Sequence, residues 1–241
     1  MIIGINGKMG SGKDTVGKII QYLLCNNVGG ITLEDIASSE DHNWWLEEQS
    51  SFETKKFAGK LKAMASLLAG VPVEKFEDQE FKKLNMGSEW NYELVGEDWV
   101  DSKPVVVPMT YREFLQKLGT EAMRDGLHTN VWVNALFADY KALHKKEKQI
   151  TPVDTSFDES TYPNWIITDM RFPNELEAVE VRNGITIRVT RPVEKSKTTA
   201  RLHPSETSLD KAEFNYEIVN DGTIKDLAEK VQIILIKEGI I

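Results

Sequence analysis

The opening fifteen residues constrain the fold of this chain more than any other segment. Residues 1–6 form a short apolar run rich in β-branched side chains, and a glycine-rich turn follows at once. Apolar side chains then recur at helical spacing over residues 14–24. A buried strand, a glycine turn and an amphipathic helix in this order are typical of the first unit of a parallel α/β sheet.

The turn itself matches the spacing G-x-x-x-x-G-K over residues 7–13. Glycine lets backbone N–H groups converge on phosphate oxygens, the helix N-terminus adds positive potential, and the lysine reaches the β- and γ-phosphates. We therefore predict a phosphate-binding loop (P-loop) for ATP. The predicted ATP-binding residues of this loop are Lys8, Gly10, Ser11, Gly12, Lys13, Asp14 and Thr15.

One position departs from the usual motif, because Asp14 follows the lysine where a Ser or Thr is usual. Thr15 comes one place later and is suited to place a hydroxyl near Mg²⁺ or a phosphate. Asp14 suits two roles, capping the helix or holding Mg²⁺ through water, and the sequence leaves both open. Asp14 and Thr15 are the predicted metal-site residues.

The rest of the chain alternates apolar strands with helical patterns, which predicts a P-loop NTPase fold with a parallel sheet flanked by helices. We expect a single domain over residues 1–241, with an acceptor-side insertion at 26–108 and a lid-like segment at 191–212. A short hairpin is expected within 91–107, and Gly119 with Thr120 is expected to end a helix. Further strands are expected at 165–168, 185–189 and 216–219, and helices at 60–69, 110–118, 130–146, 173–183 and from 223.

Composition excludes several classes of protein. A net charge of −9, from 29 basic and 38 acidic residues, disfavours a duplex nucleic-acid binder that must neutralise many phosphates. Cys25 is the only cysteine, so no intramolecular disulfide or Cys-rich metal site is expected. No apolar run approaches the length of a membrane span. We expect a cytoplasmic protein whose partners are small-molecule nucleotides.

Candidate catalytic residues follow the predicted inner strands. The strand at 165–168 leads into Asp169, as in a Walker B strand, where a carboxylate orients Mg²⁺ or an acceptor group. Arg171 lies two residues further on, and Arg191 follows the next strand. Arginines clamp phosphate bidentately, so we predict Lys13, Asp169, Arg171 and Arg191 as catalytic residues. Arg201, in the lid-like segment with Lys195 and Lys197, is a further candidate for ATP binding.

The guanine motif N-K-x-D is absent from the sequence, which disfavours a switch GTPase. Asn220, Asp221 and Gly222 follow the last predicted strand, where a loop is placed to pack on a nucleobase. We therefore include Asn220 among the expected ATP-binding residues.

Taken together, these residues resemble the phage-type deoxynucleoside monophosphate kinases, a branch of the P-loop nucleotide kinases. The likeness extends over most of the chain, apart from residues 26–50 and 85–108. It is carried by residues 11–15, Phe57-Ala58 with Lys60-Leu-Lys62, Arg112 with residues 115–121, Trp132, Asp169-Met-Arg171 with Glu175, Arg191-Pro192, residues 203–206 and residues 219–222.

The resemblance implies an ATP- and Mg²⁺-dependent enzyme that converts a deoxynucleoside monophosphate to its diphosphate. It implies that Lys62, Arg112 and Gln116 contact the acceptor and that Arg171 and the lid cations clamp the phosphates. The remaining residues assigned to the acceptor site are Gly119 and Thr120, through their backbone, and Glu175.

Two other functions remain open at this point. A related P-loop kinase for another phosphorylated acceptor, such as phosphomevalonate or dephospho-coenzyme A, would keep the same fold. A nucleotide-binding regulatory protein would use the P-loop to bind a nucleotide and would have no acceptor chemistry.

Overall fold

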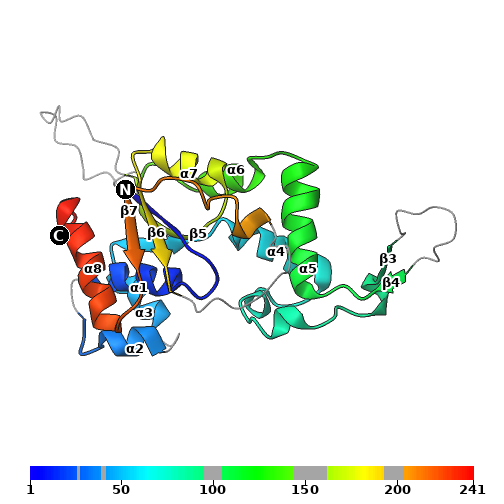
Figure 1. Ribbon diagram of the computed structural model, residues 1–241, viewed down its shortest axis with the longest axis horizontal. Coiled ribbons are helices and arrows are strands. Elements are labelled where there is room, and N and C mark those ends of the chain that lie inside the picture. Colours follow the sequence, from blue (N-terminus) through cyan, green and yellow to red (C-terminus); the bar gives the residue numbers. More distant parts are fainter. Residues whose placement is uncertain (26–27, 39–41, 95–104, 144–161, 193–203) are drawn as a thin grey trace, which may run out of the picture. The chain divides into compact units, whose positions relative to one another are not determined.

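Five parallel strands form the main sheet in the part of the chain that the structure describes (Figure 1). The structure is a computed structural model and describes residues 1–25, 28–38, 42–94, 105–143, 162–192 and 204–241. The sheet order is β2-β5-β1-β6-β7. Its strands are β1 (Ile2–Asn6), β2 (Phe52–Lys55), β5 (Asn164–Met170), β6 (Ile185–Thr190) and β7 (Tyr216–Val219).

The chain divides into two units, which are described separately. The first unit comprises Met1–Lys56 and Leu136–Ile241 and contains the five-stranded sheet, whereas the second comprises Phe57–Ala135. The P-loop and every strand of the sheet therefore belong to the first unit.

Helices cover both faces of the sheet in the first unit. On one face, α1 (Lys13–Leu23), α2 (Leu33–Ser38), α3 (Asn43–Gln49) and α8 (Ile224–Lys237) share a core with the strands. On the other face, α7 (Pro173–Glu180) lies against Gly4, where a Cβ atom would be 3.2 Å from Val179. Because β1 is covered on both sides, its isoleucines are buried, as the uniform apolar run predicted.

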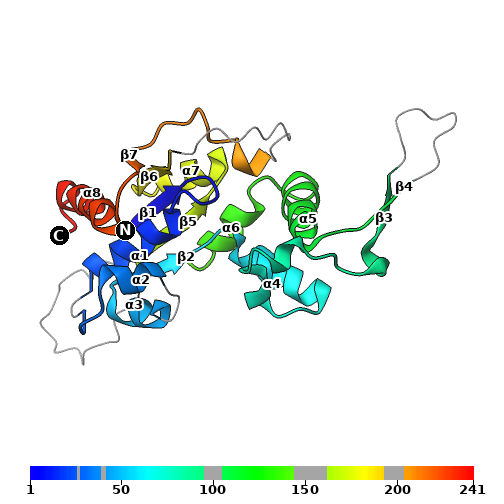
Figure 2. The ribbon, with the colours of Figure 1, turned by 60° about the horizontal axis from the view of Figure 1, so that its bottom comes forward.

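The second unit is mainly helical (Figure 2). Its core contains Ala65, Phe76, Met86 and Phe114, and the rings of Phe76 and Tyr111 meet edge to face at 5.9 Å. Its helices and turns are α4 (Ala58–Ala69), η1 (Val73–Phe76), η2 (Phe81–Lys83), η3 (Ser88–Trp90), α5 (Tyr111–Gln116) and the π-helix η4 (Lys117–Asp125). The predicted hairpin is confirmed as β3 (Tyr92–Leu94) paired antiparallel with β4 (Val105–Val107).

Three predicted helix boundaries were wrong. The helix expected over residues 173–183 ends at Glu180, and turns follow to Asn183. The helix expected to end at Gly119 and Thr120 continues from α5 directly into η4. Gly119 packs closely against α4, because a Cβ atom there would lie 2.6 Å from a methyl group of Leu61, which would have to move. The helix expected over residues 130–146 is α6 (Val131–Phe137), and Tyr140 instead leaves the helix and packs against Trp165 at 4.7 Å between ring centroids.

The N-terminal caps of two helices explain where they begin. Thr110 Oγ1 accepts a hydrogen bond from Glu113 N, but the Glu113 carboxylate accepts from the Tyr92 hydroxyl, so only half of the predicted capping box forms. At α8 the exchange is complete, because Thr223 Oγ1 accepts from Asp226 N and Asp226 Oδ2 accepts from Thr223 N at 2.7 Å. Among the described residues, no helix is long and apolar enough to cross a membrane.

The packing of α8 generates a stability prediction. Leu235 is 1% exposed in the core of the first unit, whereas its neighbour Ile236 is 56% exposed. We expect Leu235→Ala to lower the free energy of unfolding by about 2–5 kcal/mol, because a buried side chain is lost and a cavity remains. Ile236→Ala, the matched control, should change it by less than about 0.5 kcal/mol. Urea titration of both variants would contradict this packing if they were equally destabilised.

Candidate nucleotide-binding site

The loop between β1 and α1 has a backbone shaped by two left-handed glycines. Gly10 has φ 78° and Gly12 has φ 95°, values that side chains with a Cβ atom rarely adopt. Ser11 N donates to Lys8 O at 3.1 Å, and Val16 N donates to Gly12 O at 2.9 Å as α1 begins. The sequence prediction of strand, glycine turn and helix is confirmed.

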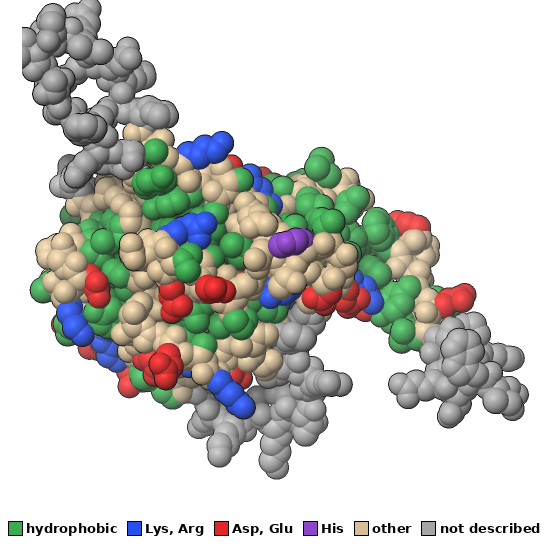
Figure 3. All heavy atoms as spheres, turned by 90° about the horizontal axis from the view of Figure 1, so that it is seen from above, with side chains coloured by type: hydrophobic (Ala, Val, Ile, Leu, Met, Phe, Trp, Pro, Cys, Tyr) green, Lys and Arg blue, Asp and Glu red, His purple; other side chains and the backbone are tan. Residues whose placement is uncertain are grey.

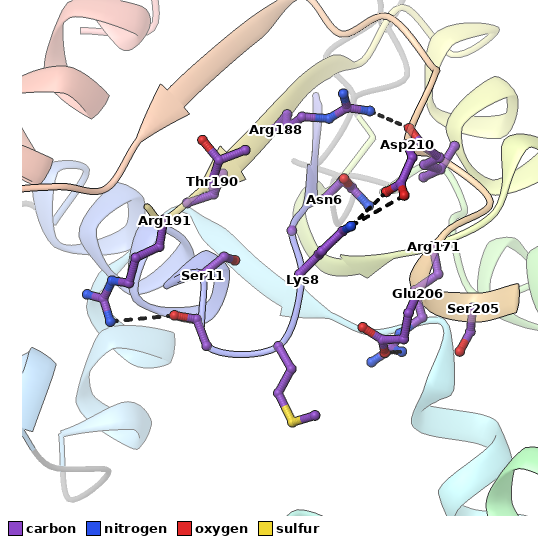
Figure 4. Close-up of a pocket in the computed structure, with 15 residues that line it drawn as sticks. Asn6, Lys8, Ser11, Arg171, Arg188, Thr190, Arg191, Ser205, Glu206 and Asp210 are labelled. Atoms are coloured by element: carbon purple, nitrogen blue, oxygen red, sulfur yellow. Dashed lines mark hydrogen bonds and ion pairs between the residues drawn. The ribbon is translucent and has the colours of Figure 1, made fainter. Parts of the chain in front are cut away.

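A cavity of about 530 Å³ opens beside this loop in the first unit (Figure 4). It is bounded by the loop residues 6–11, the end of β6 and the segment at 205–210. Four basic side chains line it, those of Lys8, Arg171, Arg188 and Arg191. A cavity with this many cations beside a glycine loop is suited to bind a polyanion.

All four cations have partners among the residues that line the cavity. Arg171 Nη1 lies 2.6 Å from Glu206 Oε1, and Lys8 Nζ lies 3.2 Å from Asp210 Oδ1 (Figure 4). Arg191 Nη1 donates to Gly10 O at 3.5 Å, a long contact. The carboxylates of the segment at 205–210 therefore occupy positions beside cations that phosphate oxygens would also favour.

Arg188 is a cavity residue that the sequence analysis missed. It donates to Leu209 O and, at 3.0 Å, to Ala212 O, and its guanidinium lies 4.3 Å from the ring centroid of Phe214. Arg188 therefore ties the segment after residue 204 to strand β6. The available signal was a basic residue inside the otherwise apolar and hydroxylic strand Ile185–Thr190.

Lys13 and Asp14 belong to a second group of charges at the start of α1. Asp14 lies 3.6 Å from Lys13 Nζ and 3.8 Å from Lys56 Nζ, and its Oδ1 accepts from Thr168 Oγ1 at 3.0 Å. Lys56, directly after β2, was not predicted from the sequence. Thr168 ties Asp14 to the end of β5, so this carboxylate connects two elements of the site.

The charge state of Asp14 follows from these contacts. Burial of the carboxyl acts to raise its pKa, but the charges of Lys13 and Lys56 and the hydrogen bond from Thr168 together outweigh it. The pKa of Asp14 therefore lies below its usual value, and the group is ionised at neutral pH.

The structure places the predicted residues near the end of β5 in different environments. Asp169 is buried in the strand, one residue before its end, and Arg171 follows the strand and faces the cavity. Glu175 is buried, and its Oε2 accepts from Arg171 N at 2.7 Å and from Phe172 N at 3.1 Å. Glu175 thus holds the backbone of the residue that carries the Arg171 side chain.

Two other predicted residues of the first unit lie close to the loop. Thr15 is half-buried in the first turn of α1. Asn220 is buried beneath the loop, where its Nδ2 donates to Ser11 O at 2.9 Å. Arg201 lies outside the described residues, as do Lys195, Lys197 and His203.

The acceptor-site residues, except Glu175, fall in the second unit. Lys62 of α4 lies 2.6 Å from Glu77 Oε1, and Arg112 of α5 donates to Gln79 Oε1 at 3.0 Å. Gly119 O accepts from Trp132 Nε1 at 2.8 Å, which gives Trp132 a structural contact. Gln116 and Thr120 are half-buried on α5 and η4. These residues come from consecutive helices that pack together on Phe114 and Leu118.

Asp14 gives a pH prediction whose sign follows from the direction of its pKa. A carboxyl with a lowered pKa in the folded state stabilises that state above its unfolded pKa, about 3.9, and this contribution is lost as the pH falls through the folded pKa. We expect the stability advantage of the wild type over Asp14→Asn to shrink as the pH falls from about 5 to about 3. Urea midpoints at these pH values measure it, with Glu229→Gln on α8 as the control. A constant difference would contradict the ion pairs.

Comparison with known proteins gives an independent line of evidence. A family model described as "Deoxynucleotide monophosphate kinase" matches residues 74–231, more than half of the chain. The chain is 25% identical to the deoxynucleoside-5'-monophosphate kinase of Escherichia phage T5, over 91% of this chain and 89% of that protein.

Two further relatives come from other viruses. A putative deoxynucleotide monophosphate kinase of Acanthamoeba polyphaga mimivirus is 24% identical, over 96% of this chain and 94% of its own length. The deoxynucleotide monophosphate kinase of Enterobacteria phage T4 is 28% identical, over 50% of this chain and 43% of its own. The resemblance seen in the motifs is confirmed, and the chain belongs to the deoxynucleotide monophosphate kinase family.

Proposed function

We propose that the chain transfers the γ-phosphoryl group of ATP to the phosphate of a deoxynucleoside monophosphate, which yields the diphosphate and ADP. Family membership makes the chain a kinase and favours this reaction over a phosphomevalonate- or dephospho-coenzyme A-type kinase and over a regulatory protein. The observation that carries the proposal is the P-loop at the edge of a cavity lined by Lys8, Arg171, Arg188 and Arg191.

The loop is the proposed site of the donor triphosphate. A helix N-terminus preceded by left-handed glycines directs backbone N–H groups and positive potential toward an anion. The Ser11 hydroxyl is buried with no hydrogen-bond partner among the described residues, which is rare in a folded protein and is accounted for if a bound ligand supplies the partner. Lys13, at the first position of α1, contributes the charge that reaches the terminal phosphates.

In the transfer step, an oxygen of the acceptor phosphate bonds to the γ-phosphorus while the bond to the β,γ-bridging oxygen breaks. The acceptor oxygen is already anionic at neutral pH, so the step needs positioning and charge stabilisation more than a base. Arg171 and Arg191 are the proposed clamps on the moving group, because guanidinium groups hold phosphate oxygens bidentately.

Substrate phosphates would then exchange with carboxylates already in the cavity. Glu206 lies 2.6 Å from Arg171 and Asp210 lies 3.2 Å from Lys8. A triphosphate carries more charge than either carboxylate, so it competes effectively for both cations. The cations therefore stay paired before and after substrate binding.

Mg²⁺ is the proposed metal, and the side chains at the start of α1 and the end of β5 fit it. Mg²⁺ prefers oxygen ligands and takes one or two carboxylates beside substrate phosphates and water. Asp14 supplies an ionised carboxylate, Thr15 a hydroxyl and Asp169 a second carboxylate near the same strand end. When bound, the ion neutralises phosphate charge. Lys13 and Lys56 lie beside Asp14 and balance its charge.

The acceptor nucleotide is proposed to bind through the second unit. Lys62 and Arg112 supply cations for its phosphate, Gln116 supplies an amide, and Gly119 and Thr120 shape the pocket through their backbone. The present partners of the two cations, Glu77 and Gln79, are polar groups that a phosphate would replace. Glu175, in the first unit, serves the acceptor side indirectly by holding the Arg171 backbone.

The proposed partners are small nucleotides and the proposed compartment is the cytoplasm. A polyanion that covers a wide surface, such as duplex nucleic acid, needs a broad basic face, and the chain carries a net charge of −9. On the face drawn in Figure 3, the basic and acidic side chains of the described residues are interspersed. This distribution favours small anions bound in local sites.

An acceptor assay tests the proposed reaction. Purified protein is incubated with ATP, Mg²⁺ and each deoxynucleoside monophosphate in turn, and ADP and the new diphosphate are measured. We expect a diphosphate product from at least one of them. ADP formation with phosphomevalonate or dephospho-coenzyme A alone, or slow ATP hydrolysis without any phosphorylated product, would replace the proposal with one of the alternatives.

Variants of the cations test the site. We expect Lys13→Ala to abolish turnover with the fold retained, because the terminal phosphates lose their charge partner.

Arg171→Ala should lower kcat by about 10³ and weaken ATP binding far less, because arginine contacts act mainly on the transition state. Steady-state kinetics and ATP calorimetry separate the two effects. Lys225→Ala, an exposed lysine of α8, is the control, and normal kcat in the Arg171 variant would remove that residue from the site.

A further inference from the structure

The side chain of Asn220 lies directly beneath the phosphate-binding loop rather than at its open side. Asn220 is 5% exposed and follows β7 at the end of the sheet. Its Nδ2 donates to Ser11 O at 2.9 Å. The reverse amide orientation would place Oδ1 against a carbonyl oxygen, so the contact defines which amide atom faces the loop.

This hydrogen bond determines the direction of a peptide group in the loop. In a trans peptide the carbonyl of one residue and the N–H of the next point in opposite directions. Because Asn220 holds Ser11 O toward the interior, the Gly12 N–H points away from Asn220. Loops of this kind bind phosphate through such outward N–H groups.

Asn220 also limits what residue 12 can be. A Cβ atom on Gly12 would lie 2.4 Å from Asn220 Nδ2, closer than real atoms approach. Gly12 has a left-handed backbone, with φ 95°, and the Asn220 side chain also occupies the space that a Cβ atom would need. Glycine is required at this position for two reasons, backbone conformation and the space that Asn220 occupies.

The support beneath the loop is itself held in place. Asn220 N donates to Thr190 O at 2.7 Å, which ties it to the end of β6. Lys230 of α8 donates to Val219 O and to Asp221 Oδ1, both at 2.7 Å, so the residues on either side of Asn220 are also anchored. Hydrogen bonds to β6 and α8 therefore hold the loop after β7 in place.

We propose that Asn220 is a positioning residue that sets the phosphate-binding geometry of the loop through Ser11 and makes no direct contact with the nucleobase. This inference rests on the proposed function, since it assumes that the loop binds the donor triphosphate. It changes the role expected for Asn220 from the sequence, where it was a residue of the base pocket.

A ligand without a base separates the two roles. Inorganic tripolyphosphate and ATP share the phosphate chain, and only ATP has adenine. The variants are Asn220→Asp, which keeps the shape and loses the donor, and Asn220→Ala. We expect both to raise the Kd of tripolyphosphate and of ATP by the same factor, about tenfold, as the loss of a buried hydrogen bond predicts. The KM for ATP should rise accordingly, with the KM for the acceptor unchanged.

Glu229→Gln on α8 is the control, because Glu229 is exposed and belongs to none of the contacts that hold Asn220 or the loop. Its affinities should stay within about twofold of the wild type. Loss of ATP affinity alone in the Asn220 variants would assign Asn220 to the base. No change, or an equal loss in the control, would also overturn the proposal. If the wild type binds neither ligand, the proposed function fails instead.

A measurement on the wild-type protein covers the case in which the Asn220 variants do not fold. The NMR resonances of the Asn220 side-chain amide should shift when tripolyphosphate binds, because the amide is hydrogen-bonded to Ser11 O and the environment of the loop changes. Replacing tripolyphosphate by ATP should add no further shift. A shift seen with ATP and not with tripolyphosphate would contradict the positioning role.

Discussion

The site depends on keeping many positive charges close together at one edge of a sheet. Lys8, Arg171, Arg188 and Arg191 line a single cavity, and like charges gathered there repel one another. The protein resolves this with local acceptors: carboxylates for Lys8 and Arg171, and backbone carbonyls for Arg188 and Arg191. These acceptors offset the repulsion among the four cations. The cations can therefore lie together in the cavity, in positions suited to a polyanion.

Polar contacts at the same edge hold the residues of the candidate site in place. Glu175 accepts two backbone N–H groups and so defines the turn that projects Arg171, while Thr168 bonds to Asp14 across from β5 to α1. Asn220 performs the corresponding task below the loop. These three residues hold the Arg171 backbone, the Asp14 carboxylate and the Ser11 carbonyl in place.

The sequence predicted the part of the candidate site that one short segment of the chain forms by itself. The apolar run of β1 and the spacing from Gly7 to Lys13 define strand, loop and helix within one short segment, and the structure agrees. Strand β2 was missed because in Phe52–Lys55 only Phe52 is buried, so no apolar run marks it. Lys56 and Arg188 were missed because their roles arise from β2 and β6 lying near the loop, which spacing along the chain does not encode. Gly119 was misread because its partner, Leu61, is distant in sequence.

Evidence for the two substrates comes from different parts of the chain. The family model begins at residue 74 and therefore does not include the P-loop, whereas the glycine spacing, the cavity and the buried Ser11 hydroxyl belong to the first unit. Most of the acceptor candidates belong to the second unit, where a glycine inside a helix brings α4 and η4 into close contact. The matched span includes Arg171, Arg188 and Arg191 of the cavity, and the glycine loop lies outside it. Together they favour phosphoryl transfer between nucleotides more strongly than a match to the loop alone, which is shared by GTPases and motor ATPases.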